Sequence, residues 1–227
     1  MFFSRHCAGC GSPGKKVLCR RCRFSMASAG SARNASDIRA AFTFEGLPRD
    51  LVLALKFRHR RAAAAVLADH MVRRLRLAPV DVVTWAPTTS RRARRRGYDQ
   101  AEMIAQAIAR QLGVPCRRLL YRAHGTAQTG KSRADRLVGP AFRARKPRSG
   151  LVVLVVDDVV TTGATLRAAA NALRSAGVAH VQLVAAASAE FGQARRAVPR
   201  SASPPPVGCA PAWASSIASS ELVKARN

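Results

Sequence analysis

The chain has 227 residues, of which 48% are hydrophobic and 5% aromatic, and 39 Lys and Arg against 12 Asp and Glu give a net charge of +27. This length suffices for the core of one domain with a small appendage. The apolar runs are too short to cross a bilayer and no signal-peptide core is present, so we expect a cytoplasmic protein without membrane insertion. The charge favours anionic partners, either nucleic acid or pyrophosphate-bearing ligands, unless the arginines only cover solvated faces.

Four of the six cysteines lie within the first 22 residues, as two Cys-x2-Cys pairs. Two such pairs offer four thiolates to a tetrahedral Zn²⁺, whereas disulfides are unfavourable in a reducing cytosol. We therefore expect a structural zinc knuckle, with a redox-active dithiol as the alternative. The expected metal ligands are Cys7, Cys10, Cys19 and Cys22.

Beyond this segment, strand-like apolar runs alternate with helical periodicity. We predict strands at residues 40–46, 80–86, 151–156 and 181–187. We predict helices at 98–112 and 166–176, and two more within 47–76 that are divided by a basic break at 56–61. Residues 25–36 are predicted to be a connector, 88–97 a loop with five arginines, and 116–149 polar and irregular. The alternation is typical of a parallel α/β sheet.

Two adjacent carboxylates, Asp157 and Asp158, follow the strand at 151–156, and a Thr/Gly segment then leads into a helix. Ligands of open α/β sheets bind at the carboxyl ends of strands. Free N–H groups at a helix start suit a phosphate, while carboxylates accept hydrogen bonds from vicinal hydroxyls. A ribose 5-phosphate moiety carries both groups. The alternative is an ordinary turn with a solvated acidic pair and a capped helix.

This segment resembles the signature of type I phosphoribosyltransferases, which bind phosphoribosyl pyrophosphate (PRPP). The resemblance implies that the Asp157 and Asp158 carboxylates hold the ribose 2′- and 3′-hydroxyls, and it makes them the candidate catalytic residues. It also implies a 5′-phosphate site formed by Thr161, Thr162, Gly163, Ala164 and Thr165.

Residues 125–132 match the P-loop pattern G-x4-G-K-S, but their surroundings argue against a P-loop. A basic segment precedes them in place of a buried apolar strand, and Gly139-Pro140 ends any helix after them within a turn or two. We expect instead a mobile basic loop that closes over pyrophosphate, as in type I phosphoribosyltransferases, with a solvated surface loop as the alternative. The candidate ligands in this loop are Gln128, Arg133 and Arg136.

The order of motifs along residues 5–188 is similar to that of the ComF (competence protein F) family of phosphoribosyltransferase-like proteins. The motifs are the four-cysteine knuckle, Leu55-Lys56-Phe57, Trp85-Ala86-Pro87, Arg96-Gly97-Tyr98-Asp99-Gln100 and the PRPP signature. The family usually has Pro-Val-Pro at the third motif and Asn at the position of Asp99. The resemblance implies a parallel-sheet α/β fold of the type I phosphoribosyltransferases. The expected parts are a zinc knuckle with connector at 1–30, a phosphoribosyltransferase-like domain at 31–192 and a disordered Ser/Pro/Ala-rich tail at 193–227.

Family members are associated with DNA uptake during natural competence, which makes competence DNA-uptake proteins candidate partners. An active transferase would use Mg²⁺ while an acceptor, which the sequence does not identify, displaces pyrophosphate from ribose C1. Candidate cations for the pyrophosphate are Lys56, Arg94, Arg95 and Arg96. One alternative is a non-catalytic protein that senses PRPP or a nucleotide and binds single-stranded DNA through its basic surface. A P-loop hydrolase is the third hypothesis.

Overall fold

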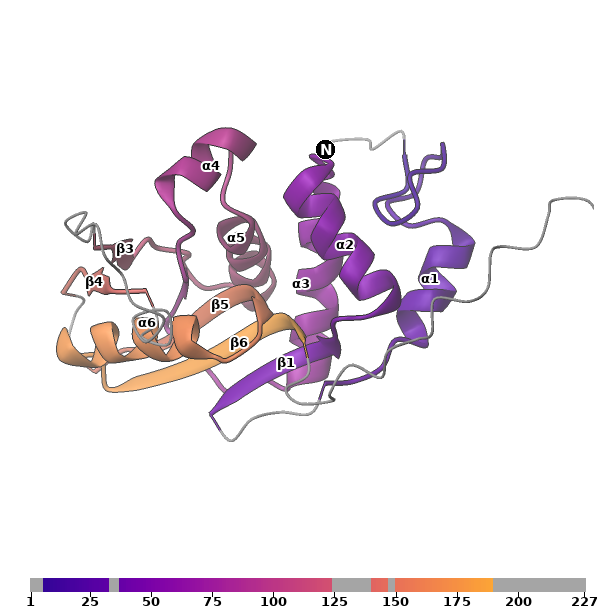
Figure 1. Cartoon of the computed structure of the whole chain (residues 1–227). Coiled ribbons are helices and arrows are strands. Elements are labelled where there is room, and N and C mark those ends of the chain that lie inside the picture. The colour runs from indigo at the N-terminus through magenta and orange to yellow at the C-terminus, as the bar shows by residue number, and fades with distance from the viewer. Residues whose placement is uncertain (1–5, 33–36, 124–139, 147–149, 190–227) are drawn as a thin grey trace, which may run out of the picture. The chain divides into compact units, whose positions relative to one another are not determined.

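Parallel strands and covering helices build the part of the chain that the computed structural model describes, residues 6–32, 37–123, 140–146 and 150–189 (Figure 1). These residues belong to the first of two units, Met1–Gly192 and Gln193–Asn227. The strands are β1 Ile38–Thr43, β2 Val82–Trp85, β3 Leu120–Arg122, β4 Phe142–Ala144, β5 Val152–Val160 and β6 His180–Ser188. The helices are α1 Arg20–Ala27, α2 Gly46–Phe57, α3 Ala62–Leu75, α4 Ser90–Arg96, α5 Gln100–Leu112 and α6 Ala164–Ser175.

The main sheet has the order β1-β6-β5-β2, and all its neighbouring strands are parallel. β5 is a central strand, which explains its continuous apolar run, because both of its faces are covered. In register, Val156 of β5 lies opposite Trp85 of β2 and Val184 of β6. The predicted parallel α/β fold is confirmed, and the carboxyl ends of all these strands meet at one edge.

Alternate residues of β5 enter two different cores. Leu154 and Val156 pack with α2, α3 and α5, whereas Val153 and Val155 pack with α6 on the opposite face. Figure 1 shows α5 and α3 on one side of the sheet and α6 on the other. This alternation follows from the pleat of a strand, which turns successive side chains to opposite faces.

Local signals in the sequence account for most helix boundaries. The basic break at 56–61 separates α2 from α3, as predicted, with His59 at φ 52° between them. Asp99 caps the start of α5, and Gly113 at φ 69° ends it. None of the described helices has the length and apolar composition that a membrane span needs.

The structure corrects three local predictions. The predicted loop at 88–97 contains the helix α4, which Thr89 caps by accepting a hydrogen bond from the Arg92 amide at 3.3 Å. The predicted connector at 25–36 begins inside α1. The predicted irregular region 116–149 contains β3 and β4, which pair antiparallel with each other. These elements escape periodicity analysis because α4 buries no residue and β3 and β4 have only three residues each.

The four-cysteine segment shares its core with the helices of the sheet. Cys7, Leu18, Cys22 and Met26 are buried in the same hydrophobic cluster as residues of α2 and α3. The backbone here forms a tight loop, in which the amide of Cys7 donates to Ser12 O at 2.8 Å. The segment is therefore packed against α2 rather than separated from it.

Candidate functional site

A cavity of about 350 Å³ lies at the carboxyl ends of β2 and β5, bordered by the end of α2 and the start of α5. Open α/β sheets bind ligands at this edge. Four cations and three carboxylates line the cavity, so it is polar and of mixed charge. The charged lining residues are Lys56, Arg92, Arg96, Asp99, Arg122, Asp157 and Asp158.

The acidic pair lies at the carboxyl-terminal end of β5, which continues through both residues to Val160. Asp158 is buried, and its backbone amide donates to Asp157 Oδ1 at 2.8 Å. Burial, together with the adjacent Asp158 carboxylate, raises the pKa of Asp157 well above its ordinary value. A carboxyl group whose surroundings oppose its ionisation in this way is typical of a functional site.

Lys56 reaches the acidic pair from the last turn of α2. Its Nζ lies 2.8 Å from Asp158 Oδ1, and the two side chains are 22% and 12% exposed. The structure places the Lys56 amine beside the acidic pair in the cavity, and its predicted role as a cation for pyrophosphate stays a prediction.

The predicted phosphate segment, residues 161–165, runs into the first turn of α6, and its last residue, Thr165, lines the cavity. Gly163 adopts φ 73°, and a Cβ there would approach the Cδ1 of Ile38 to 2.5 Å, so the loop conformation requires glycine. The hydroxyl oxygen of Thr162 accepts a hydrogen bond from the Ala164 amide at 3.2 Å. Thr165 of this segment thus lines the same cavity as the acidic pair, and the predicted role of the segment in phosphate binding stays a prediction.

Only one of the three predicted arginines of α4 lines the cavity. Arg96 does so together with Arg92, one helical turn earlier, whereas Arg94 and Arg95 are exposed and absent from the lining. Arg96 Nη1 donates to Gln100 Oε1 at 2.6 Å, and the guanidinium lies 5.2 Å from the Phe57 ring centroid. Its Nε is buried and has no hydrogen-bond partner among the described residues. This guanidinium therefore retains a donor for a ligand.

Arg122 of β3 is a cavity residue that sequence reasoning missed. Its Nε donates to Pro87 O at 3.0 Å, and its guanidinium lies 5.6 Å from the Phe142 ring centroid, which holds β3 and β4 over the site. Burial, and secondarily Arg92, lowers the pKa of Arg122. Recognising Arg92 required knowing that α4 is a helix, and recognising Arg122 required knowing that β3 exists.

Asp99 stands at a position where the ComF family usually has asparagine, and the contacts of its carboxylate account for the difference. Its Oδ2 accepts the Thr88 amide at 2.8 Å and its Oδ1 accepts the Ala101 amide at 3.1 Å. The carboxylate therefore caps α5 and holds the segment that follows β2. Burial raises the pKa of Asp99. The predicted loop residues Gln128, Arg133 and Arg136, and the P-loop-like segment 125–132, lie outside the described residues.

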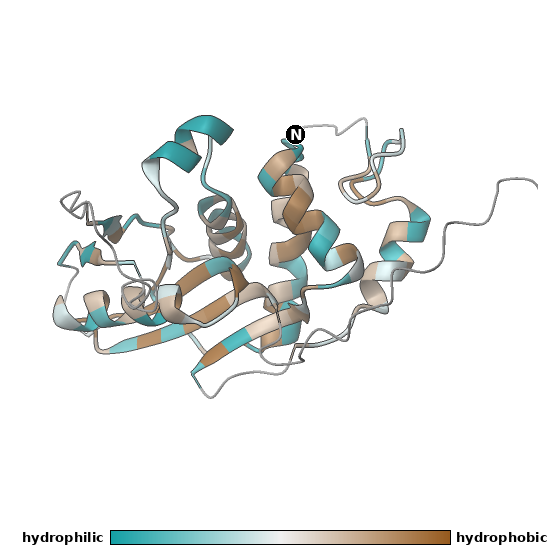
Figure 2. Ribbon diagram, viewed as in Figure 1, coloured by the Kyte–Doolittle hydropathy of each residue, from teal (hydrophilic) through white to brown (hydrophobic). Residues whose placement is uncertain are grey.

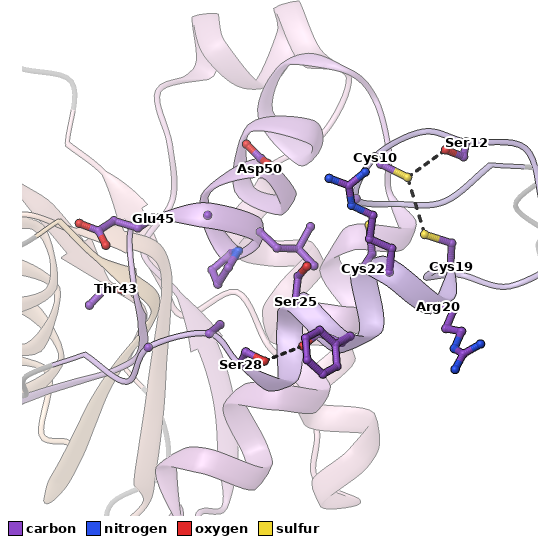
Figure 3. A pocket seen from close by; sticks show the side chains of 18 residues that line it. Cys10, Ser12, Cys19, Arg20, Cys22, Ser25, Ser28, Thr43, Glu45 and Asp50 are labelled. Carbon is purple, nitrogen blue, oxygen red and sulfur yellow. Dashed lines mark hydrogen bonds between the residues drawn. The ribbon is translucent and has the colours of Figure 1, made fainter. Parts of the chain in front are cut away.

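The four cysteines converge at the start of α1. The sulfur atoms of Cys7, Cys10, Cys19 and Cys22 all lie within 4.8 Å of one another. Figure 3 shows three of them together, with Cys10 Sγ 3.8 Å from Cys19 Sγ. Tetrahedral zinc with Zn–S bonds of about 2.3 Å separates its sulfurs by about 3.8 Å, so the arrangement fits this ion. Burial raises the pKa of Cys22 to about 12, which a divalent cation would offset.

Comparison with known proteins agrees with this geometry. The model of the phosphoribosyl transferase domain matches residues 99–203, which include α5, β5 and the loop before α6. Competence protein ComFC of Bacillus subtilis is 26% identical over 179 residues, covering 76% of this chain and 73% of the relative. The chain is similar to this competence protein and contains the greater part of a phosphoribosyl transferase domain. The ComF fold predicted from the sequence, a type I phosphoribosyltransferase sheet, is thereby confirmed.

Other relatives carry a different name. DNA utilization protein YhgH of Salmonella typhi is 35% identical over 144 residues, which cover 59% of this chain. The match spans 63% of the length of that relative, less than two thirds. Among solved structures, a crystal structure of adenine phosphoribosyltransferase is 14% identical with a TM-score of 0.41, covering 63% of this chain and 77% of that one.

Proposed function

We propose that the chain binds PRPP together with Mg²⁺ in the cavity at the carboxyl ends of β2 and β5. The observation that carries this proposal is the meeting of an acidic pair, Thr165 and three arginines around one cavity. In the proposed complex, Asp157 and Asp158 accept hydrogen bonds from the ribose hydroxyls. Residues 161–165 bind the 5′-phosphate through backbone amides, threonine hydroxyls and the favourable end of the α6 dipole.

The arginines of the cavity are the proposed pyrophosphate ligands. Arg92, Arg96 and Arg122 come from α4 and β3, and a guanidinium binds phosphate oxygens through two parallel donors. The unpartnered Nε of Arg96 supports this role, because a buried donor without a partner costs free energy that an anion would recover. Gln128, Arg133 and Arg136 remain proposed ligands from the following loop.

The side chains present also fit the two proposed metals. Carboxylate oxygens are ligands that Mg²⁺ accepts, and Asp157 and Asp158 supply them next to the proposed diol site. When bound, Mg²⁺ would neutralise charge on the pyrophosphate leaving group. We propose structural zinc at Cys7, Cys10, Cys19 and Cys22, because four thiolates leave no open ligand position for catalysis.

We propose that the cavity serves a phosphoribosyltransferase, with a non-catalytic PRPP or nucleotide sensor as the alternative. In the transferase, the chain orients the ribose so that an acceptor reaches C1 while the arginines stabilise the departing pyrophosphate. The sensor would use the same contacts and stop at binding. We further propose a cytoplasmic protein with a boundary near residue 30 and a separate tail at 193–227. The names of two relatives, a competence protein and a DNA utilization protein, support a role in competence, and we propose that this role is in DNA uptake together with competence proteins.

Calorimetric titration of Mg²⁺–PRPP into the zinc-loaded protein tests the binding proposal. We expect saturable binding that an Asp157→Asn/Asp158→Asn variant loses, while an Asp69→Asn control on the exposed face of α3 retains it. Intact binding in the acidic-pair variant would contradict the proposal. Pyrophosphate release on adding a nucleobase or an amine would identify a transferase, and binding without release for every acceptor would favour the sensor.

A second candidate function, binding of single-stranded DNA, is favoured by the exposed face of α1. Arg20, Arg21 and Arg23 are exposed there, and the Phe24 side chain is 75% exposed. A groove of about 1050 Å³ between α1 and the start of α2 includes Phe24, and Figure 3 shows Arg20 on one wall and Asp50 on the other. Cations beside an exposed aromatic ring suit phosphates and stacked bases.

Fluorescence anisotropy of a labelled oligonucleotide over a series of salt concentrations tests DNA binding. We expect the affinity to fall steeply with salt, and we expect Arg21→Ala to lower both the affinity and the slope. Phe24→Ala should weaken binding with little change in slope, because stacking releases no counterions. Binding that is insensitive to both substitutions would exclude α1 as the interface.

A further inference from the structure

The Lys56 amine lies in direct contact with the acidic pair. Its Nζ lies 2.8 Å from Asp158 Oδ1, and both groups line the cavity. With side chains only 22% and 12% exposed, water screens this pair much less than it screens a surface ion pair. The Lys56 charge therefore acts on the Asp158 carboxylate more strongly than the charge of a solvated lysine would.

The backbone around Lys56 is fixed by buried neighbours. Leu55 is fully buried, and the Tyr98 hydroxyl donates a hydrogen bond to its carbonyl. Lys56 itself lies in the last turn of α2, where the helix dipole favours a cation. Figure 1 shows α2 above the sheet edge at which β5 ends. The lysine is thus directed to the acidic pair by the fold.

Two further carboxyl groups lie near the ion pair of Lys56 and Asp158, and their negative charge needs a compensating cation. Asp157 and Asp99 line the same cavity, and the carboxylate of Asp158 contributes to the raised pKa of Asp157. Two of the three cavity arginines donate hydrogen bonds to neutral groups, Arg96 to Gln100 and Arg122 to Pro87. Among the described residues, Lys56 is the cation that forms an ion pair with a carboxylate of the cavity.

We infer that Lys56 is a resident counter-ion of the acidic pair, which keeps free divalent cations off Asp158 until a ligand arrives. The inference rests on the proposed PRPP site and deepens it. A divalent cation that approached the empty site would have to displace an ammonium group already in contact with the carboxylate. With Lys56 in contact with Asp158, the acidic pair would hold Mg²⁺ only together with the pyrophosphate, whose oxygens would supply further ligands. Lys56 thereby determines that a divalent cation binds together with the ligand and not before it.

Mn²⁺ binding to the ligand-free, zinc-loaded full chain tests this inference, with free Mn²⁺ measured by electron paramagnetic resonance. We expect Lys56→Met to bind Mn²⁺ at least about ten-fold more tightly than the natural chain, because it removes the competing charge from a poorly screened site. Adding Asp158→Asn to Lys56→Met should abolish the gain. Lys56→Arg should keep the weak binding of the natural chain.

Equal Mn²⁺ affinity in Lys56→Met and the natural chain would overturn the inference, and so would a gain that survives Asp158→Asn. Lys56→Gln provides a second neutral variant if Lys56→Met fails to fold, which circular dichroism and the melting temperature would reveal. The readout contains no PRPP, so a failure here is distinct from a failure of PRPP binding. Loss of PRPP binding by the natural chain would refute the proposed function and leave the Mn²⁺ result standing.

Discussion

Arg60 and Gly9 connect the four-cysteine segment to the end of α2. The Arg60 Nη1 atom donates a hydrogen bond to the Gly9 carbonyl oxygen at 2.8 Å. At the other end of α2, a Cβ on Gly9 would come within 2.7 Å of the Leu47 Cδ1 atom, so these two residues are closely packed. The cysteine segment therefore contacts the start of α2, the helix that carries Lys56 into the cavity, and the turn that follows this helix.

Removal of zinc should destabilise α2 as well as the cysteine segment. We expect chelation to lower the melting temperature, and we expect Cys22→Ser to abolish metal retention, because the thiolate cluster loses the cation that holds it together. Calorimetry and elemental analysis of the purified protein measure both effects. Cys116→Ser is the matched control and should retain the metal, since Cys116 lies outside the cluster. An unchanged melting temperature in metal-free protein would contradict a structural metal.

Asp157→Asn should stabilise the fold while it removes PRPP binding. Burial and Asp158 raise the pKa of Asp157, so ionisation opposes folding, and stability is lost as pH rises from about 3.8 through the raised pKa. A neutral isostere removes that penalty at neutral pH, and a gain of about 1 kcal/mol would raise the melting temperature by about 2–4 °C. Melting curves at several pH values test this, because the gain should shrink as the pH is lowered.

Asp158→Asn should have the opposite effect on stability. It leaves the Lys56 ammonium without its partner, and we expect a loss of about 2 kcal/mol after allowing for partial solvent screening. Denaturant unfolding of the two single variants side by side measures the difference. Equal changes in the two variants would show that the ion pair of Lys56 contributes nothing to stability.

The two faces of α4 should differ in their effect on pyrophosphate affinity. Arg92→Ala and Arg96→Ala should each weaken Mg²⁺–PRPP binding by about ten-fold or more, since each removes charge-assisted hydrogen bonds at the cavity. Arg95→Ala removes the same charge from the exposed face of the same helix and should change the affinity little. Calorimetric titration of the three variants checks this. Equal losses in all three would indicate a general effect of net charge.

Asp99→Ala should destabilise the fold through the lost cap of α5. Its two backbone hydrogen bonds disappear together, and caps of this kind contribute about 1–2 kcal/mol. Asp99→Asn should lose less, because the amide oxygen can still accept one of the two bonds. Asp69→Ala, which breaks an exposed ion pair with Arg73, is the control and should change the unfolding free energy by about 0.5 kcal/mol or less.

Local patterns in the sequence were sufficient to predict the class of fold and the convergence of the four cysteines. The apolar run at 151–156 predicted a central parallel strand because only a strand covered on both faces is apolar throughout. The spacing of the four cysteines predicted their convergence, which the sulfur distances bear out. Residues close in sequence carry both signals, because the local geometry of strand, turn and helix determines how such residues lie relative to one another.

The meeting of distant side chains, in contrast, depends on how the whole chain packs. The pair of Lys56 and Asp158 joins the end of a helix to the end of a strand about a hundred residues later, and no local pattern relates them. Because α4 is a helix, Arg92 and Arg96 lie at the cavity whereas Arg94 and Arg95 do not. The helix buries no residue, so no apolar period in the sequence could reveal it. Figure 2 shows α4 as mostly hydrophilic. Hydrophobic burial leaves a periodic pattern in the sequence, whereas polar side chains acquire their partners only when the packed elements bring them together.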